Sequence, residues 1–226
     1  ADLLEALGVR IDLGPDGVKE CIEEVGFGFM FAQTFHPAMR YAAPVRRELG
    51  IRTVFNLLGP LTNPAGAQYQ LLGVPEVSLG DKMAAVLNIL GSQHSLVVYG
   101  EDGLDELTLG ARNLLWEIEH GKVKSSSMSP QELDLPSAPI EQIRGGSPQE
   151  NSQILQRLFE GQEGPIRDVV LLNSAAVLMV AGKARDIKDG ITIARDAIDA
   201  GQALRKVSAL VDLSQRLGRG LSRSTL

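Results

Sequence analysis

Residues 68–103 read QYQLLGVPEVSLGDKMAAVLNILGSQHSLVVYGEDG, and this stretch decides the fold. Its apolar residues predict a strand near 68–74, a helix near 79–90 and a second strand at 95–99, which ends in a glycine-containing loop. A strand, a helix and a strand in succession are typical of sheets whose strands are joined by helices. The stretch therefore indicates an α/β fold.

A β-hairpin is expected next along the chain. The runs NLLWEIE, residues 113–119, and KVKSSSM, residues 122–128, flank His120-Gly121, and the polar second run suits an edge strand. Residues 129–149 contain four prolines and should form a long connection. Helical periodicity then predicts four helices, at 147–159, 166–180, 189–200 and 203–217.

Short elements are expected upstream of the deciding stretch. Two short helices lead the chain, and the apolar run FGFMFA, residues 27–32, is compatible with a buried strand. Proline disrupts a helix interior but is tolerated in its first turn, so Pro44 predicts two short helices, at 39–43 and 44–49.

The predicted class is α/β, with a mixed, mostly parallel sheet flanked by helices and the remnants of a small helical domain. We expect residues 1–50 to form leading helices, which belong partly to the helical domain and to a channel for the acceptor substrate. Residues 51–217 should form the α/β domain, and residues 218–226 a polar tail.

Composition excludes several classes of protein. The 226 residues carry a formal charge of −6 and no basic cluster, which argues against nucleic-acid binding. A single cysteine, Cys21, cannot form an intramolecular disulfide and is expected to fill the core of a cytoplasmic protein. The most apolar stretch, 169–182, is interrupted by Asn173 and Ser174 and is shorter than the roughly 20 residues of a membrane helix. We therefore expect no membrane span.

The first candidate site is GEDGLDELT, residues 100–108, which follows an apolar strand. Ligands of open α/β sheets collect at the carboxyl ends of strands, and the adjacent carboxylates of Asp105 and Glu106 could hold Mg²⁺ together with water and substrate phosphates. The alternative is structural: Asp102-Gly103 makes a turn, and Asp105 or Glu106 caps the next segment.

The second candidate site is HPAMRYAAPVRREL, residues 36–49. The planar guanidinium of Arg46 could pair with the carboxylate of a small aromatic acid, although exposed arginines more often form surface ion pairs. His36 could donate a hydrogen bond to a substrate, but a histidine before proline, here Pro37, also suits a structural turn. A third segment, FNLLGPLTNP at 55–64, reads as a compact structural loop. No catalytic nucleophile is assigned.

Two blocks together carry a family resemblance. HPAMRYAAPVRRELGIRTVFNLLGPLTNP, residues 36–64, is followed after a strand and a helix by VVYGEDGLDELT, residues 97–108. Their combination and spacing closely resemble anthranilate phosphoribosyltransferase, an enzyme of early tryptophan biosynthesis, and the likeness extends from residue 1 to about residue 217. The resemblance also implies a fold like that of nucleoside phosphorylases.

The resemblance implies transfer of the phosphoribosyl group of phosphoribosyl pyrophosphate to the amine of anthranilate, assisted by Mg²⁺. It makes Asp105 and Glu106 the metal ligands and Arg46 the contact to the anthranilate carboxylate. His36 and Pro37 would border the anthranilate channel. The family also implies a homodimer.

One departure from the family pattern limits this expectation. Members carry an upstream helical segment, a glycine-rich phosphate loop and a Lys-His-Gly-Asn stretch, none of which occurs in residues 1–226. Ala1 is therefore expected to be an internal or processed start, and the isolated chain to have little activity. Two other readings stay open: a pyrimidine nucleoside phosphorylase-like enzyme, and a non-catalytic fragment that pairs with another subunit.

Overall fold

The computed structural model describes residues 1–36 and 59–220, which fall into two compact units. Of these residues, the first unit comprises 1–36, 145–161 and 198–220. The second unit comprises 59–144 and 162–197. The helices expected at 39–49 lie outside the described residues.

The second unit contains a four-stranded sheet in the order β1 (Tyr69–Gly73), β2 (His94–Gly100), β3 (Asn113–Glu119) and β4 (Lys122–Met128). The strands β1 and β2 are parallel, whereas β2 pairs antiparallel with β3, and β3 with β4. Among the described strands the sheet is therefore mixed, as expected, but the prediction that it is mostly parallel is wrong.

The connections explain this strand order. Helix α6 (Gly80–Ile89) lies between β1 and β2 in sequence, and such a crossover returns the chain for parallel pairing. The loop from β2 to β3 instead stays at one end of the sheet, since the Glu101 N–H donates to the Arg112 carbonyl at 3.0 Å. The turn His120-Gly121 then joins β3 and β4 directly, which confirms the predicted hairpin.

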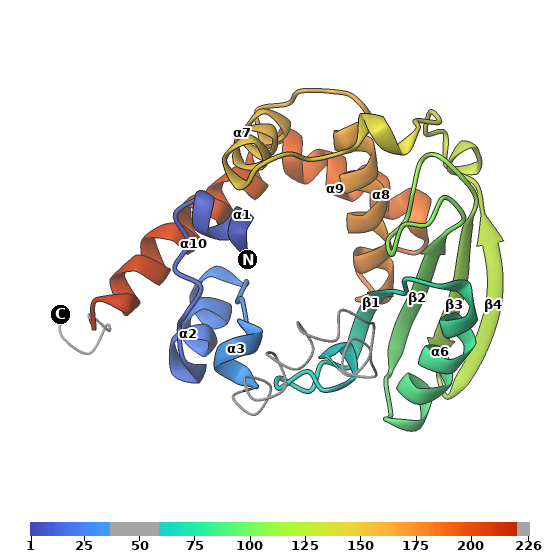
Figure 1. Ribbon diagram of the computed structural model, residues 1–226, viewed down its shortest axis with the longest axis horizontal. Coiled ribbons are helices and arrows are strands. Elements are labelled where there is room, and N and C mark those ends of the chain that lie inside the picture. Colours follow the sequence, from blue (N-terminus) through green and yellow to red (C-terminus); the bar gives the residue numbers. More distant parts are fainter. Residues whose placement is uncertain (37–58, 221–226) are drawn as a thin grey trace, which may run out of the picture. The chain divides into compact units, whose positions relative to one another are not determined.

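A helical layer covers each face of the sheet (Figure 1). Helix α6 packs against β2 and β3, and its core includes Val97 and Trp116, which lie opposite each other in the register. Successive strand residues point to opposite faces, so Leu96 and Val98 join the other core. That core contains residues of α8 (Pro165–Val180) and α9 (Ile187–Asp199).

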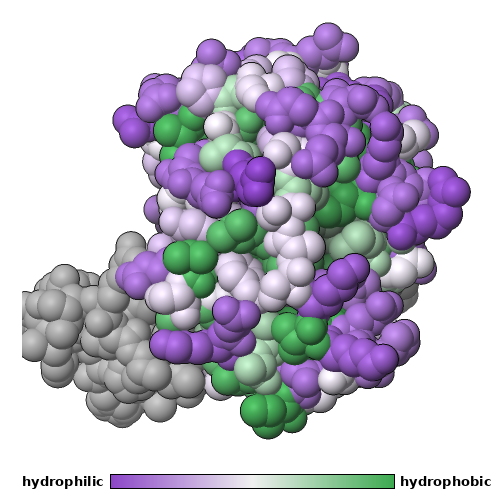
Figure 2. Space-filling model, turned by 90° about the vertical axis from the view of Figure 1, so that its right-hand side faces the viewer, coloured by the Kyte–Doolittle hydropathy of each residue, from purple (hydrophilic) through white to green (hydrophobic). Residues whose placement is uncertain are grey.

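The edge strand β4 is polar, as its sequence predicted. Six of its seven residues are exposed, and only Met128 is buried. Figure 2 shows the side of the molecule on which β4 lies, with hydrophilic side chains predominating and hydrophobic ones in separate groups. Charged residues such as Lys122 and Lys124 suit an edge strand because they oppose pairing with another chain.

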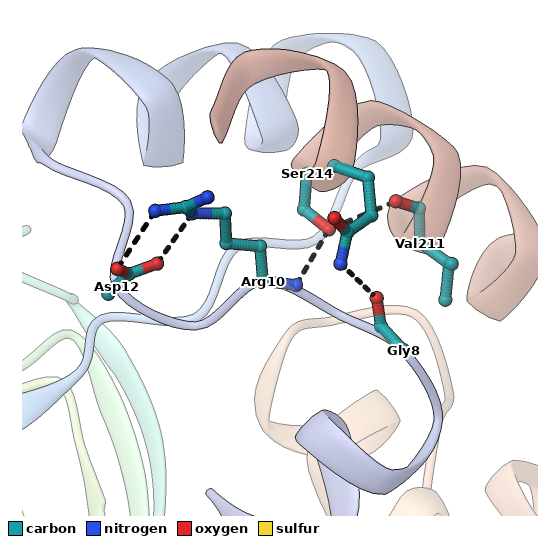
Figure 3. Close-up of polar contacts among 6 residues, drawn as sticks. Gly8, Arg10, Asp12, Val211 and Ser214 are labelled. Carbon is teal, nitrogen blue, oxygen red and sulfur yellow. Dashed lines mark hydrogen bonds and ion pairs between the residues drawn. The ribbon is translucent and has the colours of Figure 1, made fainter. Parts of the chain in front are cut away.

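The first unit is helical in the described residues. It contains α1 (Asp2–Ala6), α2 (Pro15–Val25), α3 (Ala32–Phe35), α7 (Pro148–Phe159) and α10 (Gln202–Gly218). Buried residues of the segment from Val9 to Val25 pack with Leu210 and Leu213 of α10. Polar contacts strengthen this packing, since Ser214 Oγ accepts from the Arg10 N–H at 3.0 Å (Figure 3).

This packing gives a division of the chain that differs from the one expected from sequence. Residues 145–161 and 198–217 group with the leading helices, because the apolar face of α10 meets α2 and not the sheet. The strand predicted at 27–32 is wrong. Phe29 and Phe31 pack on the helical core, where the chain has no neighbouring strand to pair with among the described residues, and α3 begins at Ala32.

Three 3₁₀ helices complete the described elements: Val77–Leu79, Pro130–Leu133 and Ile140–Gln142. The long connection at 129–149 contains the last two. Across the described residues, no helix is both long enough and apolar enough to cross a membrane.

Candidate active site

The loop between β2 and β3, residues 101–112, begins at the carboxyl ends of the parallel strands β1 and β2. Its first turn is closed by a hydrogen bond from the Gly103 N–H to the Gly100 carbonyl at 2.8 Å. Gly103 has φ +95°, which glycine adopts without strain. The predicted Asp102-Gly103 turn is therefore present. No helix starts in this loop, so Asp105 and Glu106 are not helix caps there.

Asp105 and Glu106 are both exposed residues of this loop. No other described residue forms an ion pair with either of them. Partial burial raises the pKa of Glu106, and the neighbouring Asp105 charge raises it further. The loop thus presents two adjacent carboxylates, and no cationic side chain of the described residues pairs with them. A bound cation would reduce the repulsion between their negative charges.

The donor set fits Mg²⁺ held jointly by protein and ligand. Mg²⁺ binds through one or two carboxylates and completes its octahedron with water and substrate phosphates. Among the described residues, no group of three or more acidic, histidine or cysteine side chains could hold a metal alone. Asp105 and Glu106 therefore suit a cation that arrives with a phosphorylated substrate.

Buried polar contacts fix the loop just after this pair. The Thr108 N–H donates to Asn113 Oδ1 at 2.7 Å, and Asn113 Nδ2 donates back to the Thr108 carbonyl at 3.0 Å. Thr108 Oγ1 donates to Asp102 Oδ2 at 2.5 Å, which joins the start of the loop to its middle. Thr108 and Asn113 are fully buried, so these bonds are shielded from water.

Helix α8 supplies a further contact through Asn173. Its Oδ1 accepts from the Leu107 N–H at 3.0 Å, and its Nδ2 donates to the Leu107 carbonyl at 2.9 Å. Asn173 was not among the site residues expected from the sequence, although it interrupts an apolar stretch. An asparagine within an apolar helix was the available signal, because a buried amide needs partners.

The acceptor residues predicted from sequence lie elsewhere in the chain. His36 follows α3 in the first unit, is partly exposed, and donates its backbone N–H to the Ala32 carbonyl at 2.9 Å. Pro37 and Arg46 lie outside the described residues. The structure thus presents Asp105 and Glu106 together on one loop and describes His36 separately, in the other unit.

Comparison with known proteins decides the family. Residues 1–204 match the model of the glycosyl transferase family, a/b domain. The chain belongs to this family. The α/β class and the helix-flanked mixed sheet of this glycosyl transferase agree with that assignment.

Curated relatives of this glycosyl transferase are anthranilate phosphoribosyltransferases. The protein from Dehalococcoides mccartyi strain CBDB1 is 51% identical over 222 residues, which is 97% of this chain and 65% of the relative. The protein from Thermomicrobium roseum is 52% identical over 220 residues, covering 96% and 63%. The resemblance seen in the sequence is confirmed, and the chain spans slightly less than two thirds of each relative's length.

Solved structures of the same enzyme share the fold. Anthranilate phosphoribosyltransferase from Thermus thermophilus is 47% identical, with a TM-score of 0.89 over 95% of this chain and 64% of that chain. The Saccharomyces cerevisiae enzyme in complex with phosphoribosyl pyrophosphate and Mg is 28% identical, with a TM-score of 0.88 over 95% and 62%. Another yeast structure contains 4-fluoroanthranilate.

Proposed function

We propose that this glycosyl transferase chain is the part of an anthranilate phosphoribosyltransferase that carries the metal-binding carboxylates and the acceptor site. The reaction joins the amine of anthranilate to the anomeric carbon of phosphoribosyl pyrophosphate and releases pyrophosphate, a step of tryptophan biosynthesis in the cytoplasm. Relatives about half identical to this chain carry that enzyme's name, and yeast structures contain phosphoribosyl pyrophosphate with Mg and an anthranilate analogue.

The observation that carries the proposal is the acidic loop after β2, whose two carboxylates have no ion-pair partner among the described residues. Asp105 and Glu106 would hold Mg²⁺ against the pyrophosphate group. Bound Mg²⁺ would offset the negative charge that develops on the leaving pyrophosphate. The protein's own task is to hold donor and acceptor in a reactive geometry, which explains why no nucleophilic side chain is needed.

The acceptor site in this proposal is formed by Arg46, His36 and Pro37. The guanidinium of Arg46 would form two parallel hydrogen bonds with the anthranilate carboxylate and so orient the amine for attack. His36 and Pro37 would border the channel through which anthranilate enters. A lysine at position 46 would bind the anthranilate carboxylate less well, because an ammonium group lacks the two parallel N–H donors of the planar guanidinium.

The working enzyme in this proposal is a homodimer. Its phosphate-binding site includes a glycine-rich stretch outside residues 1–226. We expect residues 1–226 alone to bind phosphoribosyl pyrophosphate weakly and to show little turnover. Ligand binding, rather than turnover, is therefore the suitable first measurement on this chain.

Thermal unfolding with added ligands tests the proposal, because a ligand that binds the folded state raises the midpoint. Mg²⁺, anthranilate and phosphoribosyl pyrophosphate would be added separately and together. We expect anthranilate to raise the midpoint, Arg46→Ala to abolish that shift, and Arg144→Ala, at an exposed arginine of the connection, to preserve it.

Other outcomes would replace the proposal. A shift with uracil or thymine and none with anthranilate would support a pyrimidine nucleoside phosphorylase-like enzyme. A folded dimer that no ligand stabilises would support a non-catalytic subunit-interaction module.

A further inference from the structure

We propose that Asn173 is a positioning residue, which fixes the backbone after Glu106 so that the Asp105–Glu106 carboxylates meet a divalent cation together. This inference rests on the proposed function of that pair. Asn173 touches neither carboxylate in the described contacts, so it would act through Leu107.

The contact between Asn173 and Leu107 uses both backbone groups of one loop residue. The Leu107 N–H donates to Asn173 Oδ1 at 3.0 Å, and Asn173 Nδ2 donates to the Leu107 carbonyl at 2.9 Å. Such paired bonds define both the position and the orientation of the peptide units on either side. We call this pair of bonds between Asn173 and Leu107 the clamp. The peptide before Leu107 contains the carbonyl of Glu106, so the clamp acts one residue from the Glu106 carboxylate.

The amide of Asn173 is itself held in place. Its Nδ2 also donates to the Val169 carbonyl of α8 at 3.0 Å, which leaves one orientation in which all three bonds form. Val169 is buried in the core of the second unit. The loop is thereby attached to α8, the most apolar of the described helices of that unit.

A second fixed point lies on the other side of the carboxylate pair. The backbone of Asp105 passes directly over Gly73, at the end of β1, where an added Cβ would collide with the Asp105 carbonyl. Asp105 thus lies against β1, and Leu107 is hydrogen-bonded to α8. Glu106 lies between these two contacts.

Loss of the clamp should affect the cation site more than the fold. The Leu107 side chain is fully buried, and the bonds between Thr108 and Asn113 do not involve Asn173. These contacts would keep the loop attached to the unit. Residues that orient metal ligands without touching the metal typically change metal affinity by about 10- to 100-fold when replaced.

The experiment titrates the chain of residues 1–226 with Mn²⁺, a paramagnetic substitute for Mg²⁺, in the presence of pyrophosphate. Equilibrium dialysis with electron paramagnetic resonance measures the Mn²⁺ that the chain retains above a blank containing pyrophosphate alone. Asn173→Leu removes all three hydrogen bonds of the amide while keeping the same number of side-chain heavy atoms, and Ser174→Ala is the matched control on the same helix. We expect Asn173→Leu to weaken Mn²⁺ binding by about 10-fold or more, with unchanged far-ultraviolet circular dichroism. Ser174→Ala should bind like the parent chain.

The outcomes separate this inference from the proposed function. If the parent chain retains no Mn²⁺ even with pyrophosphate present, or if Asp105→Asn with Glu106→Gln binds as well as the parent, the proposed metal site itself fails. If those two carboxylates are needed and Asn173→Leu binds Mn²⁺ with parent affinity, the positioning role is overturned. Should Asn173→Leu not fold, Asn173→Gln keeps both polar groups but shifts them by one methylene, and parent affinity in that variant overturns the role equally.

Discussion

The carbonyl oxygen of Asp105 lies 1.5 Å from the point where a Cβ atom at Gly73 would stand. No real Cβ tolerates such a contact, and the obstacle is backbone, which cannot rotate away as a flexible side chain can. Gly73 ends β1, and Asp105 belongs to the loop after β2, so the two strands and the acidic loop meet at this point. The absence of a side chain at position 73 is a condition for the observed loop geometry.

Replacement of Gly73 by alanine should therefore displace Asp105. We expect Gly73→Ala to weaken Mn²⁺ binding and to lower the free energy of unfolding by about 1–3 kcal/mol, the usual cost of overpacking. A Mn²⁺ titration and a urea unfolding curve would measure the two effects. Gly59→Ala is the control, because an added Cβ there meets open space. Parent-like binding by Gly73→Ala would show that the loop accommodates the methyl group.

A second glycine supports the core on the α6 side of the sheet. An added Cβ at Gly80 would lie 2.3 Å from the ring of Trp116. Alanine is favoured over glycine in a helix interior by about 1 kcal/mol, but Gly80 is the first residue of α6, and the clash should outweigh any such gain. We expect Gly80→Ala to destabilise the chain and to shift the fluorescence of Trp116, the single tryptophan, to longer wavelength.

Lys82→Ala is the matched control for Gly80→Ala, since Lys82 is exposed on the same helix. Exposed substitutions usually change stability by less than about 0.5 kcal/mol. An unchanged emission maximum and unfolding midpoint in Gly80→Ala would mean that α6 can shift away from Trp116 at little cost.

Much of the fold follows from local pattern. The β1–α6–β2 succession and the β3–β4 hairpin were predicted, because their signals are local in sequence. The apolar pattern lies within each strand or helix, and the turn residues lie directly between neighbouring elements. The grouping of α10 with the leading helices was not, since it depends on Leu210 and Leu213 meeting residues about 200 positions earlier. The apolar run at 27–32 misled for a different reason: its aromatic residues suit a strand or a helical core equally well.

The site could be predicted only in part. The position of Asp105 and Glu106 after an apolar strand made them candidates, and the family resemblance made them expected metal ligands, a role that stays a prediction. The contribution of Asn173 depends on a contact across 66 residues, and that of Gly73 on the path of the loop above it. Neither relationship leaves a motif in the sequence.

The single cysteine offers a probe of the helical unit. Cys21 is buried in that unit's core, and burial, followed by the charges of Glu20 and Glu24, raises the pKa of its thiol. Since the thiolate is the reactive form, we expect Cys21 to react slowly with a thiol reagent such as Ellman's reagent in the native chain and fully after denaturation. The sequence-based prediction of a core role for Cys21 is confirmed by its burial.

A matched variant makes this test decisive. Cys21→Ala combined with Ile22→Cys places a thiol at the next position, where the native side chain is 45% exposed. That variant should react rapidly in the native state. Equally rapid reaction of Cys21 in the parent chain would show that the packing between α2 and α10 opens on the time scale of the reagent.

The amino-terminal end of α7 should give the chain a pH-dependent stability. Ser147 and Glu150 form a capping box, in which the Ser147 N–H donates to Glu150 Oε2 at 2.7 Å. Hydrogen bonds from the Ser147 backbone and side chain lower the pKa of Glu150 below its ordinary 4.5. A lowered pKa means that the folded state favours the carboxylate. The resulting stabilisation is fully present above pH 4.5 and is lost as the pH falls through the lower pKa of the folded state.

Glu150→Gln isolates this contribution, because glutamine can still accept the capping hydrogen bonds but does not titrate. We expect the parent chain to unfold at a higher urea concentration than Glu150→Gln at neutral pH, and the difference to shrink as the pH is lowered through 4.5. Ser147→Ala, which removes the cap, should cost about 1 kcal/mol at neutral pH. A difference between parent and Glu150→Gln that is constant with pH would show that the Glu150 charge does not stabilise α7.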